Sequence, residues 1–269
     1  MLAPKKSRVL EKLRAGETVF SFKSNLNCSR PVEIAALAGY DCAWVCGEHV
    51  PTDYSVLEKQ ILAAKAYGID CVVRVPRGSY SDLVKPLELD ASGIMVPHVM
   101  NADDARKIVW QTKFHPVGRR PADGGNADGM FCLLPFQEYI RFVNENRFVM
   151  IQIEDPEPLD ELDEICSIDG IDIIFFGPGD FSQGIGTPGD FSNPKIDEAR
   201  RRIAETARKH GKFAGTVAGT ATVDEYRRMG YQFLNLGADV IAIGDYCKDI
   251  MNEVRMTKTG GSNSIYADK

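Results

Sequence analysis

The sequence lacks any apolar run long enough to cross a membrane. No stretch of its 269 residues approaches the roughly 20 consecutive apolar residues that a transmembrane helix needs. The first residues, from Met1 to Ser7, also lack the apolar core of a signal peptide. We therefore expect a cytoplasmic protein with no membrane partner.

Two further absences narrow the class of protein. The seven cysteines are odd in number, none has Cys-x-x-Cys spacing, and several lie within apolar strand patterns. Buried free thiols in a reducing compartment fit this pattern better than disulfides or a zinc site. An excess of basic residues is missing as well, because the formal net charge is −6, which argues against nucleic acid as a partner.

The sequence does contain a regular alternation of apolar runs and helical patterns. Runs rich in Val, Ile and Phe are typical of strands that are buried on both faces of a parallel sheet. Eight such runs alternate with helical stretches, which predicts a (β/α)₈ barrel, a fold that commonly spans about 250 residues. A doubly wound sheet is the alternative, but the glycine fingerprint usual after its first strand is missing.

The barrel prediction fixes the expected domain organisation. We expect one barrel domain over residues 1–256 and a flexible tail over residues 257–269, which is rich in glycine and serine. The glycine-rich segment 118–129 has no periodicity, and we expect it to be a mobile loop that selects the substrate.

Two of the apolar runs end in a carboxylate, at Glu154 and Asp180. Parallel neighbouring strands would carry both side chains to the same end of the sheet. Carboxylate oxygens suit Mg²⁺ or Mn²⁺ better than they suit thiolate-loving metals. The pair therefore predicts a divalent metal site, with two solvated loop acids as the alternative interpretation.

Other polar residues follow the predicted strands, and in a barrel the active site lies at the strands' C-terminal ends. Arg74 can stabilise an enolate oxygen, and His49 can move a proton on a substrate hydroxyl. The backbone N–H groups of Gly179 and Asp180, in a tight Gly-Pro-Gly turn, can hold a substrate carboxylate. Two further side chains at these ends are candidates for substrate contacts: His98 and Gln152.

Taken in order, these motifs resemble those of one enzyme family. It comprises the metal-dependent (class II) pyruvate aldolases of the 4-hydroxy-2-oxoheptanedioate aldolase, 2-dehydro-3-deoxygalactarate aldolase and citrate lyase β group. The resemblance runs in order and at similar spacing from about residue 15 to residue 255. The matching segments are Gly47-Glu48-His49, Val73-Arg74, Ile94-Met95-Val96-Pro97, Gln152-Ile153-Glu154 and Gly177-Pro178-Gly179-Asp180-Phe181-Ser182.

The resemblance implies a barrel of the phosphoenolpyruvate/pyruvate-domain type and a role for each matched residue. Glu154 and Asp180 would bind the metal, which is Mg²⁺ or Mn²⁺ in the first instance and Co²⁺ or Zn²⁺ in the second. His49 would be the base, and Arg74 would contact the pyruvate part of the substrate. The implied assembly is a hexamer, a trimer of dimers whose subunits exchange their last helix.

The implied reaction is the reversible cleavage of a 4-hydroxy-2-oxo acid to pyruvate and an aldehyde. Two alternatives stay open. One is another lyase on the same scaffold, such as an oxaloacetate decarboxylase or a citryl- or malyl-CoA lyase. The other is a weakly active protein that binds a metal and a 2-oxo acid.

The sequence departs from the family at several positions near the expected site, and His98, where relatives tend to carry Gln or Met, is one of them. Cys46 stands where relatives usually have an aspartate three residues before the catalytic histidine, and a neutral thiol supplies no fixed charge there. We expect this to weaken His49 as a base, so that Cys46→Asp would raise the cleavage rate. Lys23 stands where relatives more usually carry a small hydroxyl residue, which indicates a diverged choice of substrate.

Overall fold

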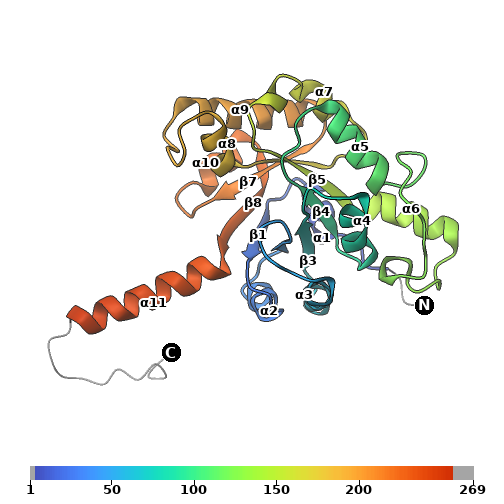
Figure 1. The fold of residues 1–269 in the computed structure, drawn as a ribbon, viewed down its shortest axis with the longest axis horizontal. Coiled ribbons are helices and arrows are strands. Elements are labelled where there is room, and N and C mark those ends of the chain that lie inside the picture. The colour runs from blue at the N-terminus through green and yellow to red at the C-terminus, as the bar shows by residue number, and fades with distance from the viewer. Residues whose placement is uncertain (1–3, 257–269) are drawn as a thin grey trace.

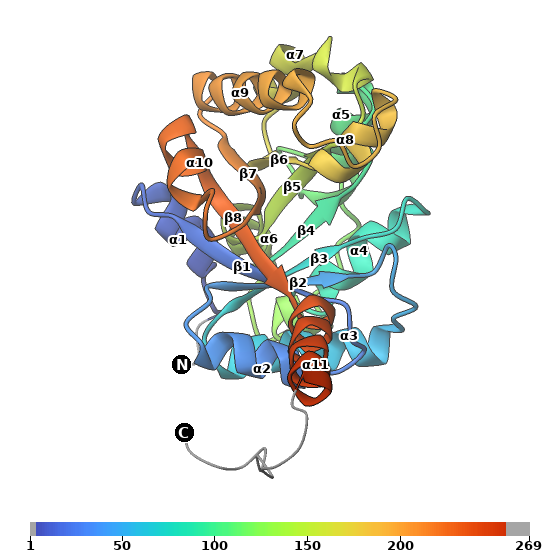
Figure 2. The same ribbon diagram turned by 90° about the vertical axis from the view of Figure 1, so that its left-hand side faces the viewer.

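Eight parallel strands close into a barrel in the computed structural model, which describes residues 4–256. Each strand pairs with the next along the chain, and β8 pairs with β1 to complete the sheet (Figures 1 and 2). The predicted (β/α)₈ fold is therefore confirmed. The strands are β1 (Val19–Ser24), β2 (Cys42–Cys46), β3 (Asp70–Arg74), β4 (Gly93–Val96), β5 (Phe148–Ile153), β6 (Ile173–Phe176), β7 (Phe213–Ala218) and β8 (Tyr231–Ala238).

Helices surround the barrel and connect its strands (Figure 1). None of those in the described part of the chain is long and apolar enough to span a bilayer. The α-helices are α1 (Arg8–Arg14), α2 (Arg30–Leu37), α3 (Tyr54–Ala66), α4 (Tyr80–Glu88), α5 (Ala102–Thr112), α6 (Phe136–Asn146), α7 (Leu162–Ser167), α8 (Pro178–Gly184), α9 (Pro194–Lys209), α10 (Val223–Met229) and α11 (Asp239–Met256). Two short 3₁₀ helices are η1 (Ala127–Gly129) and η2 (Glu157–Leu159).

The barrel interior is filled by aromatic rings. The Phe175 ring packs edge-on against Trp44 at 5.4 Å and against Phe233 at 6.2 Å between ring centroids. Gly215 makes room for this cluster, because a Cβ there would lie 2.8 Å from a Phe175 ring carbon. Burying such a ring stabilises the fold by about 1.5–3 kcal/mol, so this layer is a rigid floor beneath the C-terminal ends of the strands.

At the opposite end, α1 closes the barrel with the apolar side chains of Val9, Leu10 and Leu13. Asp70, at the start of β3, holds this helix in place. Its Oδ2 atom accepts hydrogen bonds from the Ser7 hydroxyl at 2.6 Å and from the Val9 amide at 2.9 Å. The N-terminal end of the barrel is therefore sealed.

The segment 118–129 lies at this sealed end and not at the mouth of its own barrel. Its Arg120 and Asp128 form an ion pair at 2.7 Å, with both side chains fully buried. The Arg120 amide bonds to the carbonyl of Lys113, whose ammonium donates to the carbonyl of Arg147, the residue just before β5. Buried opposite charges fix this segment beside the strand starts of its own subunit, so it does not line the mouth of its own barrel. A substrate-selecting role toward another subunit stays a prediction.

Helix α11 projects from the end of β8, away from the barrel (Figures 1 and 2). Among the described residues of this helix, Asp239 alone is buried. It is also the helix's anchor, because its carboxylate accepts a bond from the Ser24 hydroxyl at 2.9 Å. Exchange of α11 between subunits stays a prediction, and the predicted flexible tail, 257–269, lies outside the described residues.

Candidate active site

Glu154 follows β5 and is held at the barrel mouth from two sides. The side chain is 1% exposed. Gln152, two residues earlier, donates its amide to Oε2, and the backbone amide of His98 donates to Oε1 at 2.9 Å. Each carboxylate oxygen therefore has a donor that fixes its direction, as the predicted role of a metal ligand requires.

Gly177 is needed here for space and not for its dihedral angles. A Cβ at this position would lie 2.7 Å from both the Gln152 amide nitrogen and Glu154 Oε2. Pro178 then begins the short helix α8, where a missing N–H costs nothing. The predicted tight turn is thus the first turn of a helix, in which the amides of Gly179 and Asp180 have no intrahelical acceptor.

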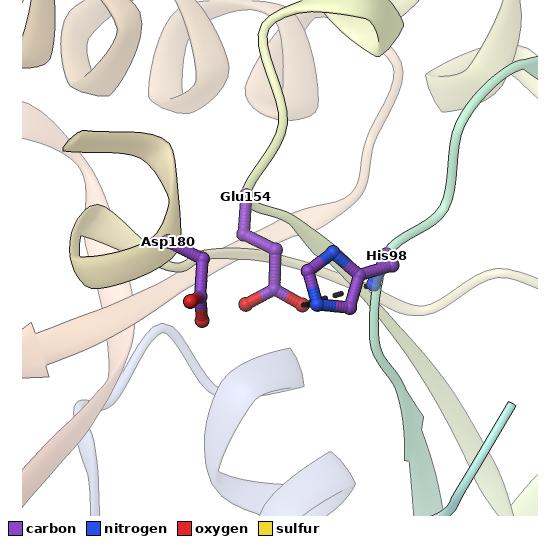
Figure 3. A group of neighbouring side chains, drawn as sticks. All are labelled: His98, Glu154 and Asp180. Atoms are coloured by element: carbon purple, nitrogen blue, oxygen red, sulfur yellow. Dashed lines mark hydrogen bonds and ion pairs between the residues drawn. The ribbon is translucent and has the colours of Figure 1, made fainter. Parts of the chain in front are cut away.

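Three side chains that can bind a metal converge at this point, and Figure 3 shows them. His98, Glu154 and Asp180 each offer a ligand atom, and these atoms lie within 4.8 Å of one another. Sequence reasoning paired the two carboxylates but treated His98 only as a substrate contact. The one available signal was the Pro97-His98 turn directly after β4, the neighbour of β5.

The backbone of His98 adopts an unusual conformation. Its φ angle is +47°, which costs a non-glycine residue of order 1–3 kcal/mol. This conformation accompanies the bond from the His98 amide to Glu154, while the ring Nδ1 lies 2.8 Å from Asp155 Oδ2. Strain of this size is typical of functional sites, where surrounding contacts hold it in place.

The two carboxylates of this cluster repel one another. Burial and, to a smaller extent, the charge of Asp180 raise the pKa of Glu154 to about 7 overall, although the hydrogen bond from His98 and the charges of His98 and Arg74 act in the opposite direction. Burial lowers the pKa of His98, but the hydrogen bond to Asp155 and the charge of Glu154 outweigh it and raise the pKa overall. Two carboxylates this close are electrostatically suited to a bound cation.

Arg74 ends β3 and lies at the mouth as predicted. Its side chain is 4% exposed, and its Nε lies 3.0 Å from Glu48 Oε2. Its Nη2 donates to the Cys46 sulfur at 3.1 Å, and its guanidinium rests on the Trp44 ring at 5.0 Å. Arg74 therefore has both the ion pair expected of a structural residue and a fixed position on the floor of the mouth.

His49 is placed differently from the other predicted residues. Its side chain is 59% exposed, and its Nε2 lies 3.4 Å from Glu48 Oε2. The Cys46 sulfur contacts the backbone amide of His49 at 3.5 Å, and its side-chain partner is Arg74. Position 46 thus acts on Arg74 more directly than on the His49 ring.

An open pocket of about 490 Å³ lies above the Trp44 floor and reaches over the rim of the barrel. It brings together Gln152, Glu154 and Asp180 with Lys23. The sequence marked Lys23 as a departure from the family near the site but gave it no role in the chemistry. His49 does not line this pocket.

A family model described as HpcH/HpaI aldolase/citrate lyase matches residues 22–244. The chain belongs to this family. The match includes every strand end described above, and it confirms the family resemblance that was read from the motifs.

Relatives of the HpcH/HpaI chain span nearly its whole length. A 2-keto-3-deoxy-L-rhamnonate aldolase from Escherichia coli is 33% identical over 234 residues, which are 87% of this chain and 85% of the relative. The structure of an HpcH/HpaI aldolase from Desulfitobacterium hafniense has a TM-score of 0.89 and 27% identity, over 97% of this chain and 100% of that one. The structure of citrate synthase SbnG has a TM-score of 0.84 and 26% identity, over 91% and 96%.

Proposed function

We propose that this protein is a divalent-metal-dependent aldolase that reversibly cleaves a 4-hydroxy-2-oxo acid to pyruvate and an aldehyde. The convergence of His98, Glu154 and Asp180 beside Arg74 carries the proposal. Membership in the HpcH/HpaI family and the similarity to a protein named as a keto-deoxy acid aldolase support it.

The residues at the mouth fit a divalent ion. Glu154 and Asp180 would hold it, with His98 as a third ligand. The buried Gln152 Oε1 atom has no hydrogen-bond partner among the described residues, and the absence of a Cβ at Gly177 lets the Gln152 and Glu154 side chains take these positions. Oxygen ligands favour Mg²⁺ or Mn²⁺, and the imidazole also admits Co²⁺ or Zn²⁺. A bound ion would polarise the oxo group of a 2-oxo acid.

Arg74 and the first turn of α8 would orient the substrate. The amides of Gly179 and Asp180, together with the Gln152 side chain, would hold the carboxylate of the 2-oxo acid. Arg74 would stabilise the negative charge that develops on the C2 oxygen. Because Glu48 and Cys46 already fix the guanidinium, little reorganisation is needed when this charge appears.

His49 would remove the proton from the C4 hydroxyl group. The C4–O bond then becomes a carbonyl, the C3–C4 bond breaks, and its electron pair forms the enolate of pyruvate. General base catalysis of this kind contributes about 10²–10⁴-fold. Glu48, whose Oε2 lies 3.4 Å from the His49 ring, is the carboxylate that would orient it.

A second candidate is another carbon–carbon lyase on the same scaffold, acting on oxaloacetate or on an acyl-CoA. The structural similarity to a protein named as a citrate synthase supports this second candidate function.

The test compares substrates under one set of conditions. Pyruvate release is measured with Mg²⁺, Mn²⁺ or Co²⁺ from 4-hydroxy-2-oxo acids of several chain lengths and from oxaloacetate. Acetyl-CoA release is measured under the same conditions from citryl- and malyl-CoA. We expect metal-dependent release from the 4-hydroxy-2-oxo acids, abolished by a chelator. Preferential turnover of oxaloacetate or a thioester would support the second candidate. Pyruvate binding without turnover of any substrate would indicate that the protein binds a 2-oxo acid but is not a lyase.

We also propose that the protein is an oligomer, most simply a hexamer, in which α11 is covered by a second subunit. This helix exposes Val240, Ile241, Ile243, Tyr246 and Met251, and helices of monomers rarely present such a surface. Light scattering should therefore give a multiple of the 29.7 kDa chain mass, and Ile243→Asp should lower it. A monomer mass at micromolar concentration would contradict this proposal.

A further inference from the structure

Lys23 extends from the end of β1 into the same pocket as Gln152, Glu154 and Asp180. Its ammonium lies 5.1 Å from the centroid of the Trp44 ring. It makes no hydrogen bond or ion pair with any residue in the described range 4–256. In this respect it differs from Arg74, the other cation on the same ring, whose charge is opposed by Glu48.

The surroundings of Lys23 make its ammonium a better acid than that of a surface lysine. Burial lowers the pKa of Lys23, and the positive charge of Arg74 lowers it further. Three groups act in the opposite direction: Cys46, Glu48 and Asp239. Lysines whose pKa is lowered by burial are suited to proton transfer, because both the protonated ammonium form and the neutral amine form are populated near neutral pH.

The proposed cleavage leaves an enolate, and its C3 atom must receive a proton before pyruvate can leave. Arg74 cannot supply it, because a guanidinium stays protonated at all relevant pH values. The carboxylates of Glu154 and Asp180 are committed to the cation. His49 is assigned to the proton of the C4 hydroxyl and lies on the exposed side of Glu48, whereas Lys23 lines the pocket together with Glu154 and Asp180. We propose that Lys23 is the catalytic acid that protonates C3, an inference that rests on the proposed function.

The step balances without any further reactant. The Nζ–H bond of Lys23 breaks, and its electron pair stays on nitrogen. The electron pair of the C2=C3 double bond forms the new C3–H bond, and the C2 oxygen regains its carbonyl double bond. The Lys23 amine then recovers a proton from water. In the reverse direction, the amine takes a proton from the methyl group of pyruvate.

The positions of the two cations fit this division of work. Arg74 and Lys23 lie 5.0 and 5.1 Å from the same ring, Trp44. In a ligand that meets Arg74 through its C2 oxygen, C3 is two bonds away from the oxygen that is held. A pocket residue on the same ring as Arg74 is therefore a suitable donor to this carbon.

Proton exchange at C3 of pyruvate isolates this step, because it needs no aldehyde and no C3–C4 bond. Pyruvate is incubated in D₂O with Mg²⁺ and the enzyme, and loss of the methyl signal is followed by NMR. We expect exchange by the unaltered protein and a loss of about 10²-fold or more in Lys23→Met, given the usual size of acid–base catalysis. Lys59→Met, which removes an exposed lysine on α3, is the matched control and should exchange normally.

Lys23→Arg separates proton transfer from charge alone. Arginine keeps the positive charge but does not release a proton, so this variant should also lose exchange. Full exchange in either Lys23→Met or Lys23→Arg would overturn the inference and leave the proposed aldolase standing. No exchange and no cleavage by the unaltered protein would sink the aldolase proposal together with the inference. Circular dichroism and calorimetric pyruvate binding check that each variant is folded and still binds.

Discussion

The two ends of the barrel differ in how their charged side chains are placed. At the N-terminal end, opposite charges are paired: Arg120 with Asp128, and Arg147 with Asp90. At the C-terminal end, Arg74 is paired with Glu48, but the carboxylates of Glu154 and Asp180 lie close together beside a strained His98. Paired charges stabilise the fold, whereas like charges held together cost stability unless a ligand neutralises them. The difference separates the part of the molecule that holds the fold from the part that is arranged for chemistry.

The largest expected effect comes from removing a carboxylate at the mouth. Glu154→Ala should lower metal-dependent pyruvate release by about 10³-fold or more, because Lewis-acid catalysis contributes several kcal/mol. Asp160→Ala removes an exposed carboxylate shortly after β5 and should keep full activity. The measurement is the initial rate with saturating Mn²⁺. If Glu154→Ala retained metal-dependent turnover, the metal assignment would fail.

At the sealed N-terminal end, removing one partner of an ion pair should lower the stability of the fold and leave the catalytic rate unchanged. Arg120→Leu leaves Asp128 buried and uncompensated, which should cost about 3–5 kcal/mol. For a chain of this size that lowers Tm by about 6–20 °C, with kcat unchanged in the folded enzyme.

The matched control for the sealed end is Arg106→Ala. The partners of Arg106 are the exposed carboxylates of Asp103 and Glu164, so the expected cost is below about 1 kcal/mol. Adding Asp128→Asn to Arg120→Leu should recover part of the loss, since it removes the unpaired charge. Equal melting temperatures for Arg120→Leu and Arg106→Ala would contradict the contrast between the two ends.

The burial of Glu154 at the mouth, with the nearby charge of Asp180, predicts a pH dependence of stability in the metal-free protein. The pKa of Glu154 is about 7 in the folded state, whereas an unfolded glutamate has a pKa of about 4.3. The folded state therefore binds this proton more tightly, and its stabilising effect, fully present below pH 4.3, is lost as pH rises through 7. Between pH 5.5 and 8 the loss should be about 2 kcal/mol.

Glu154→Gln cannot lose that proton and should remove this part of the pH dependence. The measurement is urea unfolding of both proteins in chelator at the two pH values. An identical pH dependence in the glutamine variant would show that Glu154 is not the group responsible.

The smallest expected effect is at position 46, where the structure changes the direction of the earlier expectation. The Cys46 sulfur accepts a bond from Arg74, while the His49 ring lies beside Glu48. A carboxylate in Cys46→Asp would therefore pair with Arg74 and weaken its hold on the enolate. We expect kcat to fall roughly tenfold, about 1.4 kcal/mol, instead of rising. A higher kcat would restore the view that position 46 limits His49 as a base.

Local sequence patterns by themselves determined the architecture and one pair in the site. Apolar runs buried on both faces, alternating with helices, leave few folds besides the barrel. Parallel strands end at one edge, so Glu154 and Asp180 could be brought together from their positions alone. Both inferences rest on short-range periodicity, which is a property of the chain itself.

The tertiary structure decided the rest, because it depends on contacts between distant segments. A left-handed residue after β4 turns the His98 amide to Glu154, 56 positions away. The register of β2 and β3 places Cys46 next to Arg74. The packing of the Lys23 ammonium over the Trp44 ring places Lys23 in the pocket. The burial of Arg120 with Asp128 takes a glycine-rich segment away from the mouth. No local pattern encodes these positions, because each side chain's partner is fixed only when the barrel closes.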